Sequence, residues 1–204
     1  MQYSSITTKP QLTIPRVSCS YSYDNRHLHR FFKMRAAPLL MSENIFPNIK
    51  EITESMGAFV AIHEYLIKNG IDRNSDKVDV YAIGDGHSPR TAALIACLTK
   101  WNCISIDPEM RPKAWNFKRL TTFRNKVEDV SFDGNNNRIA IIVCVHSHAK
   151  LTDCLKSIKN YKERHLINIP CCVKPDLDIE PNFTFCDVGI QSEKQTVSVY
   201  LNCN

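Results

Sequence analysis

The sequence predicts an α/β fold, a doubly wound and mostly parallel sheet of seven strands that ends in an antiparallel hairpin. Residues 78–106 have the pattern strand, helix, strand, which is a βαβ unit. The run RIAIIVCVHSH at 138–148 is almost continuously apolar, as expected for a central strand covered by helices on both faces. Two further strand patterns, FTFCDVGI and QTVSVYLN, are separated by a short polar turn, which requires them to run antiparallel.

The individual elements follow from the spacing of the apolar residues. Residues 49–67 carry an apolar face with helical spacing, and Asn69-Gly70 marks its end. Further helices are predicted at 89–100, 111–119 and 151–161. Strands are predicted at 78–83, 103–106, 120–123, 138–148 and 165–172, followed by the hairpin at 183–190 and 195–202.

Length and composition indicate one ordinary globular domain. The chain has 204 residues, of which 43% are hydrophobic and 23% charged. No apolar run approaches the roughly 18 residues that cross a bilayer, so we expect a soluble protein without a membrane partner. We predict a basic extension rich in Ser and Thr at residues 1–44 and a single domain at 45–204.

The positive charge is concentrated in the N-terminal extension. Residues 1–42 contain six Lys or Arg and one acid, Asp24, whereas the net charge of the whole chain is +5. The segment is interpreted as a flexible extension, an arm that meets phosphate-rich partners, or an organelle transit peptide. Nine cysteines without a disulfide framework favour reduced thiols and a cytoplasmic or nuclear location, with cytoplasmic preferred.

A glycine turn follows the first strand. In Gly84-Asp85-Gly86 the two glycines allow a positive φ and let a ligand lie against the backbone. Ser88 is expected to cap the next helix and Pro89 to occupy its first position. The turn would therefore direct free N–H groups and a positive helix end toward the crevice above the strands.

Asp107 comes twenty-one residues after Gly86, at the tip of the second strand. A carboxylate there can accept two hydrogen bonds from a ribose diol, an arrangement typical of adenosine sites; the alternative is a tight turn with a capping aspartate. NAD is disfavoured because the turn lacks the third glycine of dinucleotide sites, and no P-loop motif occurs.

At these motifs the chain resembles the class I S-adenosylmethionine-dependent methyltransferases. VYAIGDG is similar to the family's first motif, ISIDP to its acidic second-strand tip, and KVEDVSF to its third-strand region. The closing hairpin is also typical of that family. The resemblance covers about residues 48–202 and identifies 45–204 as a Rossmann-like, methyltransferase-type domain.

The resemblance implies S-adenosylmethionine as the cofactor. Gly84 and Gly86 would lie against its amino acid portion, and Asp107 would hold the ribose hydroxyls. Asp85 is a candidate partner of its ammonium group, because a cation close to a carboxylate is well matched. The adenine would be bordered by Val127 and Glu128.

The acceptor is expected above the end of the fourth strand, where the sequence reads Val145-His146-Ser147-His148. His146 and His148 are the candidate catalytic residues, since a histidine can act as a base near neutral pH. They would share a face if the strand persists, and with Cys171 or Cys172 they could instead hold Zn²⁺. A third interpretation is two ordinary loop histidines; no metal is assigned.

The methyl acceptor is not identified by any motif. RNA is slightly favoured, because the N-terminal extension is basic and residues 111–120 combine four basic residues with Trp115 and Phe117. That segment also fits an amphipathic helix with its aromatic rings inward. Arg90 could reach a carboxylate of cofactor or substrate. The alternative to an enzyme is a catalytically inactive module that serves as a binding partner or complex subunit. A third interpretation is a nucleotide-binding protein that uses the same crevice for another adenosine compound, and the oligomeric state is not predicted.

Overall fold

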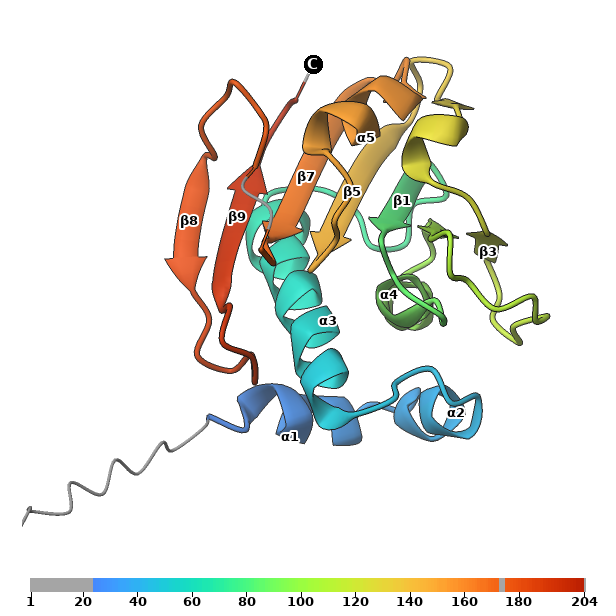
Figure 1. Cartoon of the computed structure of the whole chain (residues 1–204), viewed down its shortest axis with the longest axis vertical. Helices are drawn as coiled ribbons and strands as arrows, with labels where there is room; N and C mark the ends of the chain where they lie inside the picture. Colours follow the sequence, from blue (N-terminus) through green and yellow to red (C-terminus); the bar gives the residue numbers. More distant parts are fainter. Residues whose placement is uncertain (1–23, 173–174, 204) are drawn as a thin grey trace, which may run out of the picture.

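The computed structural model describes residues 24–172 and 175–203 (Figure 1). A seven-stranded sheet with the order β3-β2-β1-β5-β7-β9-β8 forms its centre, and β9 is the strand that runs antiparallel to its neighbours. The strands are β1 (Val78–Ile83), β2 (Asn102–Ile106), β3 (Leu120–Phe123), β5 (Ile139–Val145), β7 (Glu163–Ile169), β8 (Phe183–Cys186) and β9 (Thr196–Tyr200). The predicted sheet, its central fourth strand and its C-terminal antiparallel pair are confirmed.

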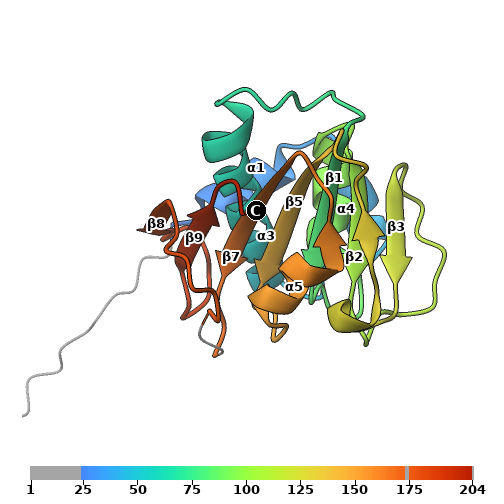
Figure 2. The ribbon, with the colours of Figure 1, turned by 90° about the horizontal axis from the view of Figure 1, so that it is seen from above.

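Helices cover both faces of the sheet (Figure 2). One face is covered by α1 (Arg26–Phe32), α2 (Ala37–Ser42), α3 (Ile49–Ile62) and α4 (Arg90–Leu98). The other face is covered by α5 (Leu151–Ser157) and the short helix η2 (Val127–Asp129).

Both faces of the central strands are therefore buried. In β1, Val80 packs into the core under α3 and α4, whereas Tyr81 packs into the core under α5. In β5, Val143 packs on the face covered by α3 and α4, and Ile142 packs on the face covered by α5. Because successive side chains of a strand point to opposite faces, a strand between two cores is expected to be largely apolar. Strand β5 is apolar throughout, and in β1 the exception is Asp79, whose buried carboxylate pairs with Arg138.

The folded unit includes residues that the sequence assigned to the N-terminal extension. Phe31 of α1 and Leu40 of α2 are fully buried in the core that also contains α3. The predicted boundary after residue 44 therefore lies inside the packed unit, which reaches back to at least α1. The remainder of the predicted extension, residues 1–23, lies outside the described residues.

The predicted helix at 111–119 is wrong, because this segment forms a loop. Pro108 and Pro112 disfavour helical geometry at and before their own positions. Trp115 and Phe117 both pack against the core. Side chains two residues apart share a face in an extended chain but not in a helix, so burying both rings requires the loop.

Other boundaries also differ from the prediction. The helix predicted at 151–161 ends at Ser157, and the chain continues as β6 (Ile158–Lys159), which pairs with β4 (Phe132–Asp133) in a small second sheet. The helix at 49–67 ends in a π-helical turn, η1 (His63–Ile67). The strand predicted at 165–172 stops at Ile169. Among the described residues, no helix has the length and apolarity needed to cross a membrane.

We expect Leu40→Ala to lower the free energy of unfolding by about 2–5 kcal/mol, because it removes a fully buried side chain and leaves a cavity. Leu39→Ala is the matched control: Leu39 is the preceding residue of the same helix, is 38% exposed, and should cost less than about 1 kcal/mol. Urea denaturation of the full chain measures both. Equal effects of the two substitutions would contradict the inclusion of α2 in the folded unit.

Candidate active site

A pocket of about 420 Å³ opens at the carboxyl ends of the parallel strands. Its walls come from the segments that follow β1, β2, β3 and β5. From β1 the order of strands proceeds in one direction through β2 to β3 and in the other through β5 to β7. This reversal is the place where open α/β sheets bind their ligands, and the volume lies within the roughly 300 to 1,000 Å³ of small-molecule sites.

Most of the site residues predicted from the sequence meet at this pocket. Its lining includes Gly84, Asp107, Val127, Glu128, His146 and His148, whereas Asp85 and Gly86 do not belong to it. The tips of β1 and β2 are neighbours, as the prediction required, because the two strands pair in parallel from Asp79↔Asn102 to Ile83↔Ile106.

The glycine turn adopts the predicted left-handed backbone, with φ of 74° at Gly84 and 81° at Gly86. The Gly84 N–H donates to the Ile106 carbonyl at 2.9 Å, so the turn continues the pairing with β2. A Cβ on Gly84 would lie 2.4 Å from Ser147 Oγ in the loop after β5. Glycine is therefore required here both for its conformation and for the close approach of that loop.

Asp107 fastens the glycine turn to the tip of β2. One carboxylate oxygen accepts the Gly86 N–H at 2.7 Å, and the other accepts the Glu109 N–H, also at 2.7 Å. The side chain is largely buried, yet it lines the pocket. Each ionised oxygen has room for a further donor, so the carboxylate can bind a diol while it holds the turn.

Asp85 has a different role from the predicted contact with an ammonium group. Its carboxylate is buried and accepts hydrogen bonds from Thr91 N at 2.8 Å, Ala92 N at 3.2 Å and Ser105 Oγ at 2.9 Å. Burial raises the pKa of Asp85 from 3.8 to about 6, although these hydrogen bonds act in the opposite direction. Asp85 thus joins the first turn of α4 to β2 and stays outside the wall of the pocket.

The predicted cap of α4 by Ser88 is also wrong. The helix begins at Arg90 after Pro89, and the Ser88 hydroxyl donates to the Ile45 carbonyl at 2.6 Å. The carboxylate of Asp85 bonds the N–H groups that the Ser88 side chain was expected to reach. An ionised oxygen is the stronger acceptor for the positive end of a helix.

Arg90 contacts the protein rather than the pocket. Its Nε donates to the Asp85 carbonyl at 2.6 Å, and its guanidinium pairs with Glu51 of α3. Burial lowers the pKa of Arg90, and the nearby charge of Asp107 opposes this effect. Arg90 was predicted to contact a carboxylate of the ligand. Instead it forms an internal ion pair with Glu51 and a hydrogen bond to the glycine turn.

The two predicted catalytic histidines face different partners. Strand β5 ends at Val145, and His146 has a φ of 50°, so the chain turns before His148. His146 Nε2 lies 3.0 Å from Glu54 Oε1 and 3.5 Å from Ser192 Oγ, whereas His148 Nε2 lies 3.6 Å from Cys172 Sγ. The expectation of a shared face does not hold because the strand does not persist.

Glu54 is the residue of this site that the sequence analysis missed. Its side chain is 2% exposed in the middle of α3, and Lys50 Nζ lies 3.2 Å from the same oxygen that faces His146. A buried carboxylate needs a charged or hydrogen-bonding partner. No sequence signal identified Glu54, because its burial is seen only in the structure, where every residue of α3 from Ile52 to Phe59 is buried.

The charged residues of the pocket wall give it an acidic character. The wall includes three acidic residues, Asp107, Glu109 and Glu128, and one lysine, Lys126. Val127 is buried beside them, and its carbonyl accepts a hydrogen bond from Ser157 Oγ at 2.7 Å. Such a wall favours a ligand with positive charge over a polyphosphate.

The strand order, with the antiparallel β9 inserted between β7 and β8, and a pocket at the tips of β1 and β2 together decide the fold. The chain has the class I methyltransferase-like fold. Among solved structures, a mutant of MtNAS is similar to it at 11% sequence identity and a TM-score of 0.44, with 89% of this chain and 83% of that chain covered. No protein-family model and no curated protein matches the sequence.

We expect Asp85→Asn to remove a specific pH dependence of stability. As the pH rises from about 4 to about 6, the unfolded chain loses the proton of this carboxyl while the folded chain keeps it. The unfolded state then binds fewer protons, so the group should lower the free energy of unfolding over this range, by at most roughly 3 kcal/mol. Urea denaturation of both proteins across the range measures the difference, and parallel curves would contradict the assignment.

Proposed function

We propose that the chain binds S-adenosylmethionine in this pocket and transfers its methyl group to a nucleophilic acceptor. The observation that carries the proposal is the pairing of Gly84 and Asp107 at neighbouring strand tips, on the wall of a 420 Å³ pocket at the point where the strand order reverses. That position is where this fold brings a glycine backbone and a carboxylate to one adenosine ligand. The N–H groups of Gly84 and Gly86, predicted to be free, are bonded within the protein, so the turn contributes space and not donors.

The wall offers groups for the ribose, the adenine and the backbone of the amino acid portion. Asp107 keeps acceptor sites for the two ribose hydroxyls, and Val127 with Ile106 supplies an apolar border for the adenine. The backbone at Gly84 is free of a side chain and can lie against the amino acid portion. Asp85 is not proposed as the ammonium partner, because its carboxylate is bonded to α4 and Ser105.

The acidic wall supports S-adenosylmethionine over other adenosine compounds. The sulfonium carries a positive charge, which the carboxylates of Asp107, Glu109 and Glu128 stabilise. ATP and NAD would instead bring phosphates toward those carboxylates with only Lys126 to compensate. The charge of the wall and the missing third glycine therefore favour the same ligand.

His146 is the proposed general base. In the transfer the acceptor atom bonds to the methyl carbon, the carbon–sulfur bond breaks with its electron pair left on sulfur, and the acceptor loses a proton. Glu54 Oε1 lies 3.0 Å from Nε2 of His146, so a proton on Nε2 would face this carboxylate and leave Nδ1 to accept the proton of the acceptor. Such a base and orienting-acid pair is the usual arrangement for proton transfer.

RNA as the methyl acceptor stays a prediction. The side chains of Arg111 and Lys118 are exposed in the loop that leaves the pocket after Asp107, which supports contacts to phosphates, whereas Lys113 Nζ is paired with Glu43 at 2.8 Å. Trp115 packs against the core with Lys113 Nζ 4.5 Å from its ring centre, so stacking on bases is not supported. The basic residues before Asp24 lie outside the described part of the chain.

We expect the full chain to bind S-adenosylmethionine in calorimetry and to bind neither ATP nor NAD. Asp107→Ala should weaken this binding about tenfold to a hundredfold, because it leaves the ribose hydroxyls unpaired. Asp129→Ala is the control: it removes an exposed carboxylate close to Glu128 that is not part of the pocket wall, and should change affinity less than about twofold. A folded Asp107→Ala protein with unchanged affinity, or no binding by the natural chain, would overturn the proposed ligand site.

We expect His146→Ala to abolish methyl transfer while it retains cofactor binding, because the acceptor proton loses its base. Glu54→Gln should slow transfer by about 10²-fold and change the pH dependence of its rate, since Glu54 acts through His146. Transfer of a labelled methyl group to RNA, protein and metabolite pools is the measurement. Binding without transfer to any pool would support the alternative, a catalytically inactive module that serves as a binding subunit.

A further inference from the structure

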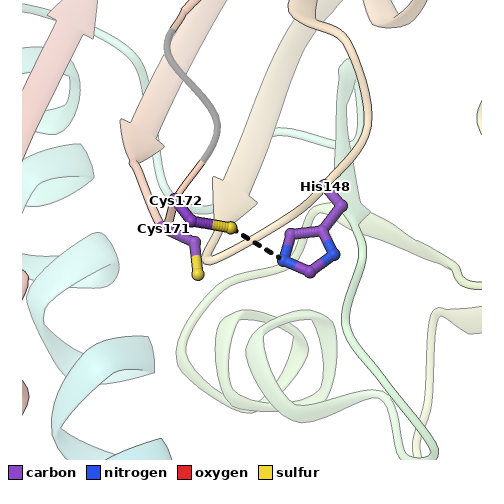
Figure 3. A group of neighbouring side chains, drawn as sticks. All are labelled: His148, Cys171 and Cys172. Carbon is purple, nitrogen blue, oxygen red and sulfur yellow. Dashed lines mark hydrogen bonds between the residues drawn. The ribbon is translucent and has the colours of Figure 1, made fainter.

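Three potential metal ligands meet beyond the ends of β5 and β7. They are His148, Cys171 and Cys172, and Figure 3 shows the Cys172 thiol directed at the imidazole with the Cys171 thiol beside it. The Sγ and ring nitrogen atoms all lie within 4.8 Å of one another. Within the described residues this is the one group of three histidine, cysteine or acidic side chains so arranged.

The fold brings these residues together because β5 and β7 are parallel neighbours that end at the same level, with Val145 paired to Ile169. Adjacent cysteines in a strand would point to opposite faces. Here β7 ends at Ile169, and Pro170 separates the strand from the cysteines. The backbone bends at Cys172, which allows both thiols to lie on the side of the histidine.

The distances are compatible with a tetrahedral metal site. Bonds of about 2.3 Å to sulfur and 2.0–2.1 Å to nitrogen give a tetrahedral zinc site ligand-to-ligand edges of about 3.5–3.8 Å. Cys172 Sγ and His148 Nε2 are already 3.6 Å apart. The remaining separations, within 4.8 Å, would close by small side-chain rotations in a loop exposed at His148 and Cys172.

We propose that His148, Cys171 and Cys172 bind one Zn²⁺ ion, with the fourth position open. Two thiolates and one imidazole form a soft ligand set that selects zinc over magnesium, calcium or manganese. Each thiol releases its proton on binding, so the site carries a net charge near zero. Neither cysteine is in a disulfide, and both are more exposed than the core residues Cys103 and Cys144.

The fourth coordination position of the zinc ion would be available to a ligand from the pocket. His148 lines the pocket and also supplies a ligand, so the ion would lie at the pocket's rim. Zinc sites with three protein ligands offer their fourth position to water or to a substrate group. Resting on the proposed methyl transfer, we assign this position to an oxygen, nitrogen or sulfur atom of the acceptor, which the ion would hold near the methyl group.

The test uses the full chain purified under reducing conditions and loaded with Zn²⁺ or Co²⁺ in the absence of S-adenosylmethionine. We expect one equivalent of metal by elemental analysis and, with Co²⁺, a thiolate-to-cobalt charge-transfer band together with the visible bands of a tetrahedral site. Zn²⁺ should also raise the melting temperature. Substoichiometric metal, or a cobalt spectrum without the thiolate band, would overturn the proposal.

Variants separate this cluster from other ligands. Cys171→Ser, Cys172→Ser and His148→Ala should each weaken zinc binding at least about tenfold, and the double cysteine variant should remove it. Cys186→Ser changes an exposed cysteine outside the cluster, and His146→Ala changes the histidine that faces Glu54, so both should keep one equivalent. Retention of zinc by the double variant would refute the site even if the single variants are unstable.

Two further measurements distinguish failure of the zinc site from failure of the cofactor pocket. Peptide mapping of metal-free protein prepared without reductant would locate any disulfide between Cys171 and Cys172, and such a disulfide together with absent zinc binding would overturn the proposal. Calorimetry with S-adenosylmethionine on the double cysteine variant tests the cofactor pocket separately. Metal binding without cofactor binding would leave the zinc site standing and refute the proposed transfer.

Discussion

Two buried carboxylates fix the loop after β1, and the pocket depends on the shape of that loop. Asp85 joins it to the first turn of α4 and to Ser105 of β2, while Asp107 binds the Gly86 N–H from the tip of β2. A buried carboxylate without its donors costs several kcal/mol, so neither contact can open alone without a large penalty. The tips of β1 and β2 are therefore held together before any ligand arrives, which reduces the ordering that binding would require.

Most of the fold could be predicted from the sequence because its signals are local. The apolar run of β5 specifies a strand buried on both faces, and the short turn between the last two strand patterns leaves only an antiparallel arrangement. The spacing from Gly86 to Asp107 places both at one end of a βαβ unit, where they do meet. These predictions need only periodicity and chain length, so they hold without knowledge of distant contacts.

The remaining features depend on contacts between distant segments. The sequence shows that an aspartate occupies position 85 but not that its carboxylate is buried. Because it is buried, the carboxylate accepts hydrogen bonds from N–H groups of α4 and does not reach a ligand. The sequence around Trp115 and Phe117 predicted a helix. In the structure both rings pack against the core, which requires an extended loop. Glu54 and His146 come from segments far apart in the chain, and the ends of β7 and β5 bring Cys172 to His148; no local pattern encodes either pair.

The turn after β5 also determines how the two proposed functions are related. The left-handed conformation of His146 directs its ring toward Glu54 on α3, and two residues later His148 faces the cysteines that follow β7. The proposed base, His146, and the proposed metal ligand, His148, therefore lie on the same loop but contact different side chains. Loss of the ion would leave the Glu54 contact intact, and loss of that contact would leave the three metal ligands in place. One short segment can thus carry a proton-accepting group and a metal-binding group at the same pocket, because its backbone turns between them.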